Sequence, residues 1–278
     1  MNNNIKILST LYFLLGGNMK NSKKNICLFV ISVVASIIMV FLSINSQYPD
    51  GLGMDRAPFD YAWFDVYVYT SSTFLVVATL ILILSCKKIH DLYHSGMIKN
   101  MIQRETISNI KKNLLANTWL SGLFLYPVFL ILTYIICFIV FPTRGAGINI
   151  GPDGPMYNSL LILLKSCVIT IIYSIIVFNV TLIVSKKMKS FAVTTILSFI
   201  IILIYSAISQ LIFVNIFKTF LSEQFAKGFD LINGLIFGFG STISILIHGF
   251  ILVIITTLIL NKIYKDTNEV VLNYENQN

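Results

Sequence analysis

Six long apolar segments, separated by polar segments of varied length, dominate the hydrophobic pattern of this chain. Each is long enough for a helix to cross the hydrocarbon core of a bilayer, which takes about 20 residues. The alternating ten-residue pattern of a membrane β-barrel is absent. The pattern predicts an all-α integral membrane protein, a single transmembrane domain over residues 1–278 with six transmembrane helices. The spans are expected at about 26–44, 66–86, 119–141, 160–185, 191–217 and 235–260.

Composition and charge agree with membrane insertion and predict an orientation. Hydrophobic residues make up 56% of the chain and charged residues 12%, against about 25% charged in soluble domains. Of the 20 Lys and Arg, 15 lie in segments 1–25, 87–118, 186–190 and 261–278. Because cytoplasmic loops are enriched in Lys and Arg, this bias predicts a multi-pass protein of the cell membrane with both termini in the cytoplasm. The frequent Asn, Lys and Ile indicate a bacterial source.

The net charge of +8 does not predict nucleic-acid binding, because the basic residues lie at the ends of the apolar segments. Lipid is the partner that such placement favours. The low charged fraction and the several apolar runs of about 20 residues exclude an ordinary soluble enzyme, whose core does not need such runs.

Two further segments are predicted to lie along the membrane surface. Residues 1–25 contain a modest apolar run followed by Lys and Asn, which predicts an amphipathic interfacial helix before the first span. Between spans five and six, Phe220, Phe225 and Phe229 recur at spacings that fit short helices at the outer interface. A plain loop is the alternative there.

Residues 94–114, between spans two and three, have the spacing of an amphipathic cytoplasmic helix. The apolar stripe of this helix begins with Met97, Ile98, Met101 and Ile102. The opposite face carries Lys99, Asn100, Gln103, Arg104 and Lys111. Such a helix could rest on anionic lipid, or its apolar stripe could occupy a groove on a partner protein.

The whole arrangement resembles the permease subunits of type-2 ABC exporters. The resemblance covers nearly the whole chain in topology: an interfacial N-terminal helix, six spans and the largest inner segment between spans two and three. It is specific in residues only around 95–119, where Ser95-Gly96-Met97-Ile98-Lys99-Asn100-Met101-Ile102-Gln103-Arg104 runs on towards the third span. Glu105 stands where the family frequently has Pro. In that family this loop forms a coupling helix that docks in a cleft of the ATPase subunit.

The resemblance implies that residues 94–114 are such a coupling helix. Arg104 and Glu105 are then the candidates for pairing with charges of the ATPase. Met97, Ile98 and Met101 are the candidates for filling its cleft. The remaining docking residues implied by the motif are Gly96, Lys99 and Asn100.

The resemblance also implies the partners and the cargo class. This chain contains no Gly-Lys pair and hence no P-loop, so it is not predicted to be an enzyme or to hold a cofactor. ATP and Mg would be bound by a separate cytoplasmic ATPase, and a second copy or a related permease would complete the path. The family moves peptides, lipids and drugs, and an amphipathic or hydrophobic cargo is expected here. Exporters of cytolytic peptides, such as the phenol-soluble modulin exporters, are one kind that fits.

Polar residues inside the spans are candidates for lining the translocation path. They are Lys165, Asn179, Gln210, Asn215 and His248. The uncharged members could instead form hydrogen bonds across helices. The Lys165 side chain is long enough to snorkel to the outer headgroups. No span carries an acidic residue for ion coupling, so a secondary transporter is disfavoured.

Two other functions are alternatives to export. A stand-alone immunity or sensor protein would bind a peptide at its outer loops and leave residues 94–114 on lipid. The segment HDLYH places His90 and His94 on one helical face at a spacing that can bind zinc. A metalloprotease would need H-E-x-x-H, and Asp91 is shorter than the Glu of that motif, so no metal site is predicted.

Overall fold

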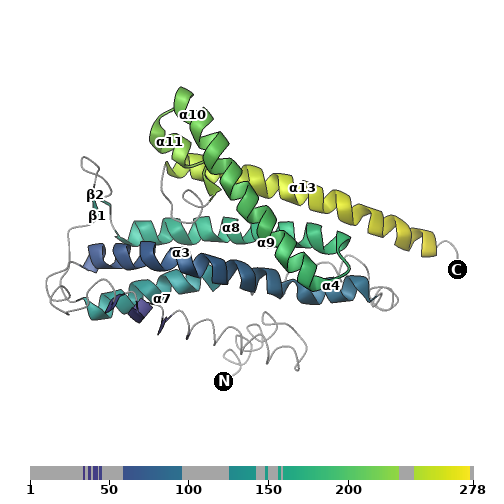
Figure 1. The fold of residues 1–278 in the computed structure, drawn as a ribbon, viewed down its shortest axis with the longest axis horizontal. Helices are drawn as coiled ribbons and strands as arrows, with labels where there is room; N and C mark the ends of the chain where they lie inside the picture. Colours follow the sequence, from purple (N-terminus) through teal and green to yellow (C-terminus); the bar gives the residue numbers. More distant parts are fainter. Residues whose placement is uncertain are drawn as a thin grey trace, which may run out of the picture. The chain divides into compact units, whose positions relative to one another are not determined.

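A computed structural model of the chain describes residues 34, 37–38, 40–42, 44–45, 59–95, 125–141, 148–149, 156–157, 159–231 and 241–275. Their regular structure is helical apart from one pair of two-residue strands (Figure 1). The predicted helical fold class is therefore confirmed for the part of the chain that the structure describes.

Three of the described helices are long and apolar enough to cross a membrane. The first is α8 (Ser159–Lys187). The second is a continuous helix over Phe191–Phe220, made of α9 (Phe191–Ile208), the π-helix η1 (Ser209–Val214) and α10 (Asn215–Phe220). The third is the first part of α13 (Thr242–Glu275), over Thr242–Ile263. They correspond to the predicted spans four, five and six and indicate a multi-pass membrane protein.

The other predicted spans are described by shorter or partial helices. Helix α3 (Phe59–Ser85) begins before the predicted second span and covers most of it. Helix α7 (Leu125–Val140) covers the predicted third span from its seventh residue almost to its end. The described residues of the predicted first span are helical. The predicted interfacial helix at 1–25 lies outside the described residues.

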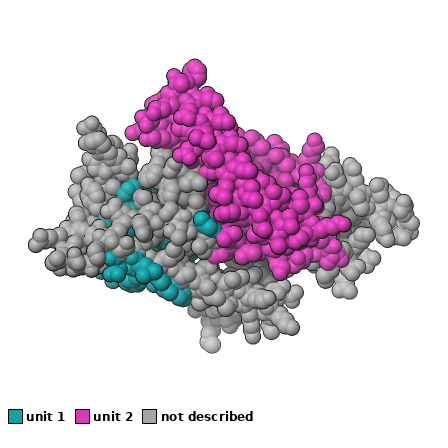
Figure 2. Space-filling model, viewed as in Figure 1, with its two compact units in different colours: residues 1–78, 115–171, 236–238 teal, residues 79–114, 172–235, 239–278 magenta. Residues whose placement is uncertain are grey.

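The chain divides into two compact units, which Figure 2 colours separately. Unit 1 consists of residues 1–78, 115–171 and 236–238. Unit 2 consists of residues 79–114, 172–235 and 239–278.

Aromatic side chains hold α3 and α7 together in unit 1. The Phe59 ring meets the rings of Tyr134 and Phe138 edge-on, at centroid distances of 5.0 Å and 5.4 Å. The Trp63 ring meets Tyr134 in the same way at 5.3 Å. Edge-to-face pairs of this kind add to the stabilisation that burial gives.

The strand pair, β1 (Ile148–Asn149) and β2 (Met156–Tyr157), lies in the segment before α8 and is antiparallel.

Helix α9, in unit 2, has the burial pattern of a membrane helix. Its buried residues are Thr194, Ser198, Ile202 and Ser206. Large apolar side chains such as Ile196, Leu203 and Ile204 are exposed. A water-soluble helix has the reverse pattern, with its apolar residues inside. Small residues at the helix contact and large apolar residues outside are the arrangement that lipid permits.

The segment between α10 and α13 contains a short helix, α11 (Glu223–Lys227), where the apolar spacing predicts one. The Ser222 hydroxyl caps it by accepting a hydrogen bond from the Phe225 N–H at 3.3 Å. Lys227 Nζ lies 3.0 Å from Glu223 Oε1. The hydrogen bond from Lys227 and the charges of Lys218 and Lys227 lower the pKa of the exposed Glu223 carboxyl.

Gly228, which follows α11, approaches α13 so closely that a larger residue would not fit. A Cβ at this position would lie 2.8 Å from Ser244 Cβ and 3.0 Å from the backbone nitrogen of Ile245.

We expect Gly228→Ala to separate α11 from α13 and to lower the free energy of unfolding by about 1–3 kcal/mol. Thermal unfolding in detergent would measure this, with the exposed Gln224→Ala as the control variant. Equal stability of the two variants would contradict this contact.

Candidate functional site

Helix α4 (Lys87–His94) leads from α3 into the segment predicted to dock a partner. It follows a turn at Cys86. The Cys86 and Ile89 side chains form a buried apolar cluster with Phe178 and Leu182 of α8, against which Leu260 of α13 packs. The first turn of α4 is thereby anchored by burial of apolar surface.

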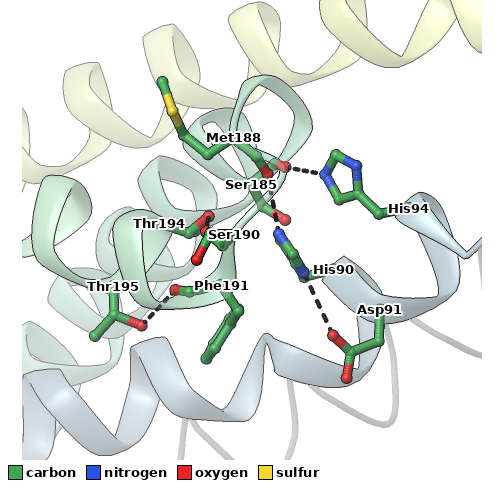
Figure 3. Close-up of polar contacts among 9 residues, drawn as sticks. All are labelled: His90, Asp91, His94, Ser185, Met188, Ser190, Phe191, Thr194 and Thr195. Atoms are coloured by element: carbon green, nitrogen blue, oxygen red, sulfur yellow. Dashed lines mark hydrogen bonds and ion pairs between the residues drawn. The ribbon is translucent and has the colours of Figure 1, made fainter.

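Two histidines on one face of α4 contact the end of α8 and the turn that follows it (Figure 3). His90 Nε2 lies 3.0 Å from the carbonyl oxygen of Met188. His94 Nε2 lies 2.8 Å from the carbonyl oxygen of Ser185. We call His90 and His94 the histidine pair. Because a carbonyl oxygen can only accept, each ring must carry a proton on Nε2 and donate it.

The two rings of the histidine pair also contact each other and the start of α9. Their centroids are 4.5 Å apart, which confirms that the i, i+4 spacing places them on one helical face. The His90 ring meets the Phe191 ring edge-on at 5.3 Å. His90 is only 3% exposed, whereas His94 is exposed.

The histidine pair satisfies backbone groups that a helix end leaves without helical partners. The last carbonyls of an α-helix have no N–H group four residues ahead within the helix. At the end of α8, the Val184 carbonyl accepts the Met188 N–H at 3.1 Å. The next carbonyl, that of Ser185, accepts from His94, and that of Met188 accepts from His90. The imidazoles thus act as side-chain caps for a helix end.

Hydroxyl groups fix the other side of the same turn. Ser190 precedes α9 in an extended conformation, with φ −96° and ψ 129°. Its carbonyl oxygen accepts from both the N–H and the hydroxyl of Thr194, each at 3.1 Å. The Thr195 hydroxyl donates to the Phe191 carbonyl at 3.0 Å. Only three residues separate α8 from α9, so this turn joins the two helices closely.

The histidine pair serves as a hydrogen-bond donor in this arrangement. His90 Nδ1 also lies 3.4 Å from Asp91 Oδ1, so both ring nitrogens of this buried histidine have a polar neighbour. Among the described residues, no group of three or more His, Cys, Asp or Glu side chains could hold a metal ion.

The predicted docking residues lie almost wholly outside the described residues. The structure describes segment 94–114 only at His94 and Ser95, where the Ser95 N–H donates to the Asp91 carbonyl at 2.9 Å and ends α4. The docking candidates outside the described residues are Gly96, Met97, Ile98, Lys99, Asn100, Met101, Arg104 and Glu105.

The path candidates occupy separate environments. Lys165 lies in the part of α8 that belongs to unit 1 and is partly buried. Gln210 and Asn215 are exposed on η1 and α10. The Asn215 amide donates to the Leu211 carbonyl at 2.7 Å.

Asn179 and His248 are buried and bonded to neighbouring helices. The Asn179 amide, in a side chain only 3% exposed, donates to the hydroxyls of Thr256 and Thr257 on α13, each at 3.1 Å. His248 Nε2 lies 2.8 Å from the Tyr205 hydroxyl on α9. Both residues therefore connect α13 to another helix of unit 2. Whether either also lines a path stays a prediction.

The sequence pattern did not reveal the hydrogen-bond partners of the histidine pair. The histidine pair was visible as an i, i+4 repeat, but its carbonyl partners lie more than 90 residues further along the chain. Helical spacing indicates which side chains share a face, and it carries no information about which backbone groups that face will meet.

Comparisons with known proteins found no match: no protein-family model matches the chain, no curated protein matches it, and no solved structure matches it.

The Asn179 contact gives a test of how α8 and α13 are joined. We expect Asn179→Leu to lower the free energy of unfolding by about 0.6–1.7 kcal/mol, which spans the average and the maximum found for hydrogen bonds between membrane helices. The double variant Thr256→Val/Thr257→Val removes the acceptors of the Asn179 amide and should lose much of the same free energy of unfolding. The triple variant should lose less than the sum of the losses in Asn179→Leu and in the double variant, because both remove the same hydrogen bonds.

The matched control is Thr181→Val on α8, whose hydroxyl donates within its own helix to the Val177 carbonyl at 2.8 Å. Its effect should add to that of the threonine pair. Unfolding in mixed detergent would measure all the variants. Strict additivity of Asn179→Leu with the threonine changes would contradict an interhelical bond.

Proposed function

We propose that this chain is the transmembrane permease subunit of an ATP-driven exporter. The three long apolar helices and the inverted burial of α9 support a membrane protein. The six apolar segments and the basic amphipathic segment at 94–114 support the exporter arrangement within that class. In this proposal the chain crosses the membrane six times, has both termini in the cytoplasm and places α11 at the outer surface.

The observation that carries the proposal is the attachment of α4. A segment that receives force from a soluble motor must be joined stiffly to the spans that it moves. Helix α4 ends where the predicted docking segment begins, at His94 and Ser95. It is fixed to the last turn of α8 and to the α8–α9 turn by one hydrogen bond each, and to α8 also by a buried apolar cluster. A helix that merely rested on lipid would not need two polar attachments to the spans.

The chemical work is divided between chains in this proposal. A separate cytoplasmic ATPase binds ATP and Mg and receives residues 94–114 in a cleft. Met97, Ile98 and Met101 fill that cleft, and Arg104 and Glu105 set the register by charge. This chain forms the path with a second copy or a related permease, and it has no catalytic role.

The cargo in this proposal is an amphipathic peptide, a lipid or a hydrophobic drug. The described surfaces of α9 and α13 carry many exposed apolar side chains, Ile, Leu and Val on α9 and Ile, Leu and Phe on α13. A path lined by such faces would favour cargo with an apolar side, because burying apolar surface is favourable in proportion to its area. Lys165, Asn179, Gln210, Asn215 and His248 are the polar groups that such a path could present.

Co-purification with the ATPase encoded nearest to this chain tests the proposal. We expect the ATPase to copurify with the wild-type chain after mild solubilisation. Met97→Asp places a charge in the apolar stripe, and Arg104→Glu reverses a pairing charge. Each should reduce the recovered ATPase at least tenfold, since losing about 1.4 kcal/mol of binding changes an equilibrium constant by that factor.

The matched control is Lys262→Glu, the same charge reversal at an exposed position of α13. It should leave the recovered ATPase unchanged. If no ATPase copurifies with the wild-type chain, the exporter proposal fails. A stand-alone protein that binds a peptide at its outer loops would then be the function to test.

A further inference from the structure

We propose that the histidine pair carries movement of the docking segment to the α8–α9 turn, so that α8 and α9 move together with the ATPase. This inference rests on the proposed function and names the residues through which the motor acts. His90 and His94 are positioning residues in this mechanism, since they touch neither cargo nor nucleotide.

The two hydrogen bonds fix both the distance of α4 from the end of α8 and the orientation of α4 relative to it. His90 and His94 are four residues apart, about 6 Å along a helix axis at 1.5 Å per residue. One bond reaches the Ser185 carbonyl in the last turn of α8, and the other reaches the Met188 carbonyl just beyond it. A single contact would allow α4 to pivot, whereas two contacts one turn apart resist rotation about either one.

Burial makes separation of α4 from the turn unfavourable. His90 is 3% exposed, so breaking its bond to Met188 would leave a buried donor without its partner. An unpaired buried polar group costs the full desolvation penalty of that group. A displacement of α4 is therefore expected to take the turn with it.

The first turn of α4 is attached to the same helix by apolar contact. Cys86 and Ile89 pack against Phe178 and Leu182, which lie on α8 one to two turns before Ser185. Helix α4 is thus joined to α8 by an apolar cluster at its start and by hydrogen bonds at its end. The docking segment follows directly after the hydrogen-bonded end.

The short turn passes the movement on to α9. Only residues 188–190 lie between α8 and α9, and the hydrogen bonds from Thr194 to the Ser190 carbonyl stabilise this connection. The His90 ring also touches the Phe191 ring at the first position of α9. Without the histidine pair, the docking segment would act on the spans mainly through its covalent links to α3 and the third span.

The experiment compares two double variants that differ in hydrogen-bond donors. His90→Leu/His94→Leu keeps apolar bulk and removes both donors. His90→Gln/His94→Gln keeps an N–H donor at each position. Movement of the α8–α9 turn is followed by an environment-sensitive fluorophore attached to a cysteine introduced by Lys189→Cys. Cys27→Ser and Cys167→Ser remove two other cysteines that could react with the fluorophore. The full chain is reconstituted in nanodiscs with its ATPase, and the emission is recorded before and after Mg-ATP with vanadate.

We expect the nucleotide to shift the emission in the parent chain and in the glutamine pair. The leucine pair should lose most of that shift, by threefold or more, while it still copurifies with the ATPase. If the leucine pair does not fold, as judged by size-exclusion chromatography, His94→Leu carries the test, because this side chain is exposed and its removal disturbs no core. That single variant should then lose at least half of the shift.

The outcomes separate this inference from the function on which it rests. A full shift in the leucine pair, or equal loss in the leucine and glutamine pairs, overturns the role of the histidine hydrogen bonds and leaves the exporter proposal standing. Failure of the ATPase to copurify with the parent chain overturns both.

Discussion

Every peptide group in the hydrocarbon core of a membrane must find its hydrogen bond within the protein, because no water is present there. Long helices meet this requirement, and α8, the helix over Phe191–Phe220 and the first part of α13 are the elements that follow from it. The same constraint explains the burial pattern of α9, where small hydroxyl residues face the neighbouring helices and large apolar residues face outward. Among the described residues, irregular backbone occurs in short stretches, such as residues 188–190 between α8 and α9.

The turn between α8 and α9 is such a stretch, and its carbonyl groups provide attachment points for α4. Imidazole suits this task because it is short, has few rotatable bonds and can donate a directed hydrogen bond while its ring packs against apolar neighbours. The ring of His90 does this by donating to the Met188 carbonyl and lying edge-on to Phe191. Helix geometry leaves the last carbonyls of α8 without helical partners, and the histidine pair supplies donors there, which joins α4 to the end of α8 and to the start of α9.

Sequence reasoning succeeded where one strong physical signal decides the structure. The apolar runs at 160–185 and 191–217 predicted two helices separated by a short basic turn, and the structure has α8, residues 188–190 and α9 there. The same reasoning placed His90 and His94 on one helical face. It could not find the carbonyls they meet, nor the bonds from Asn179 to α13, because residue spacing describes one helix and not its neighbours. The π-helical segment η1 was also unforeseen, since its apolar sequence fits an α-helix equally well.

The central claim is that residues 94–114 bind an ATPase, and photo-crosslinking in living cells tests it most directly. A photoreactive amino acid would replace Met101, which lies on the predicted apolar stripe. The account predicts a covalent adduct whose mass equals that of this chain plus the ATPase, and no such adduct when the photoreactive residue replaces the exposed Lys262. Efficient incorporation at position 101 with adducts to lipid alone would contradict it.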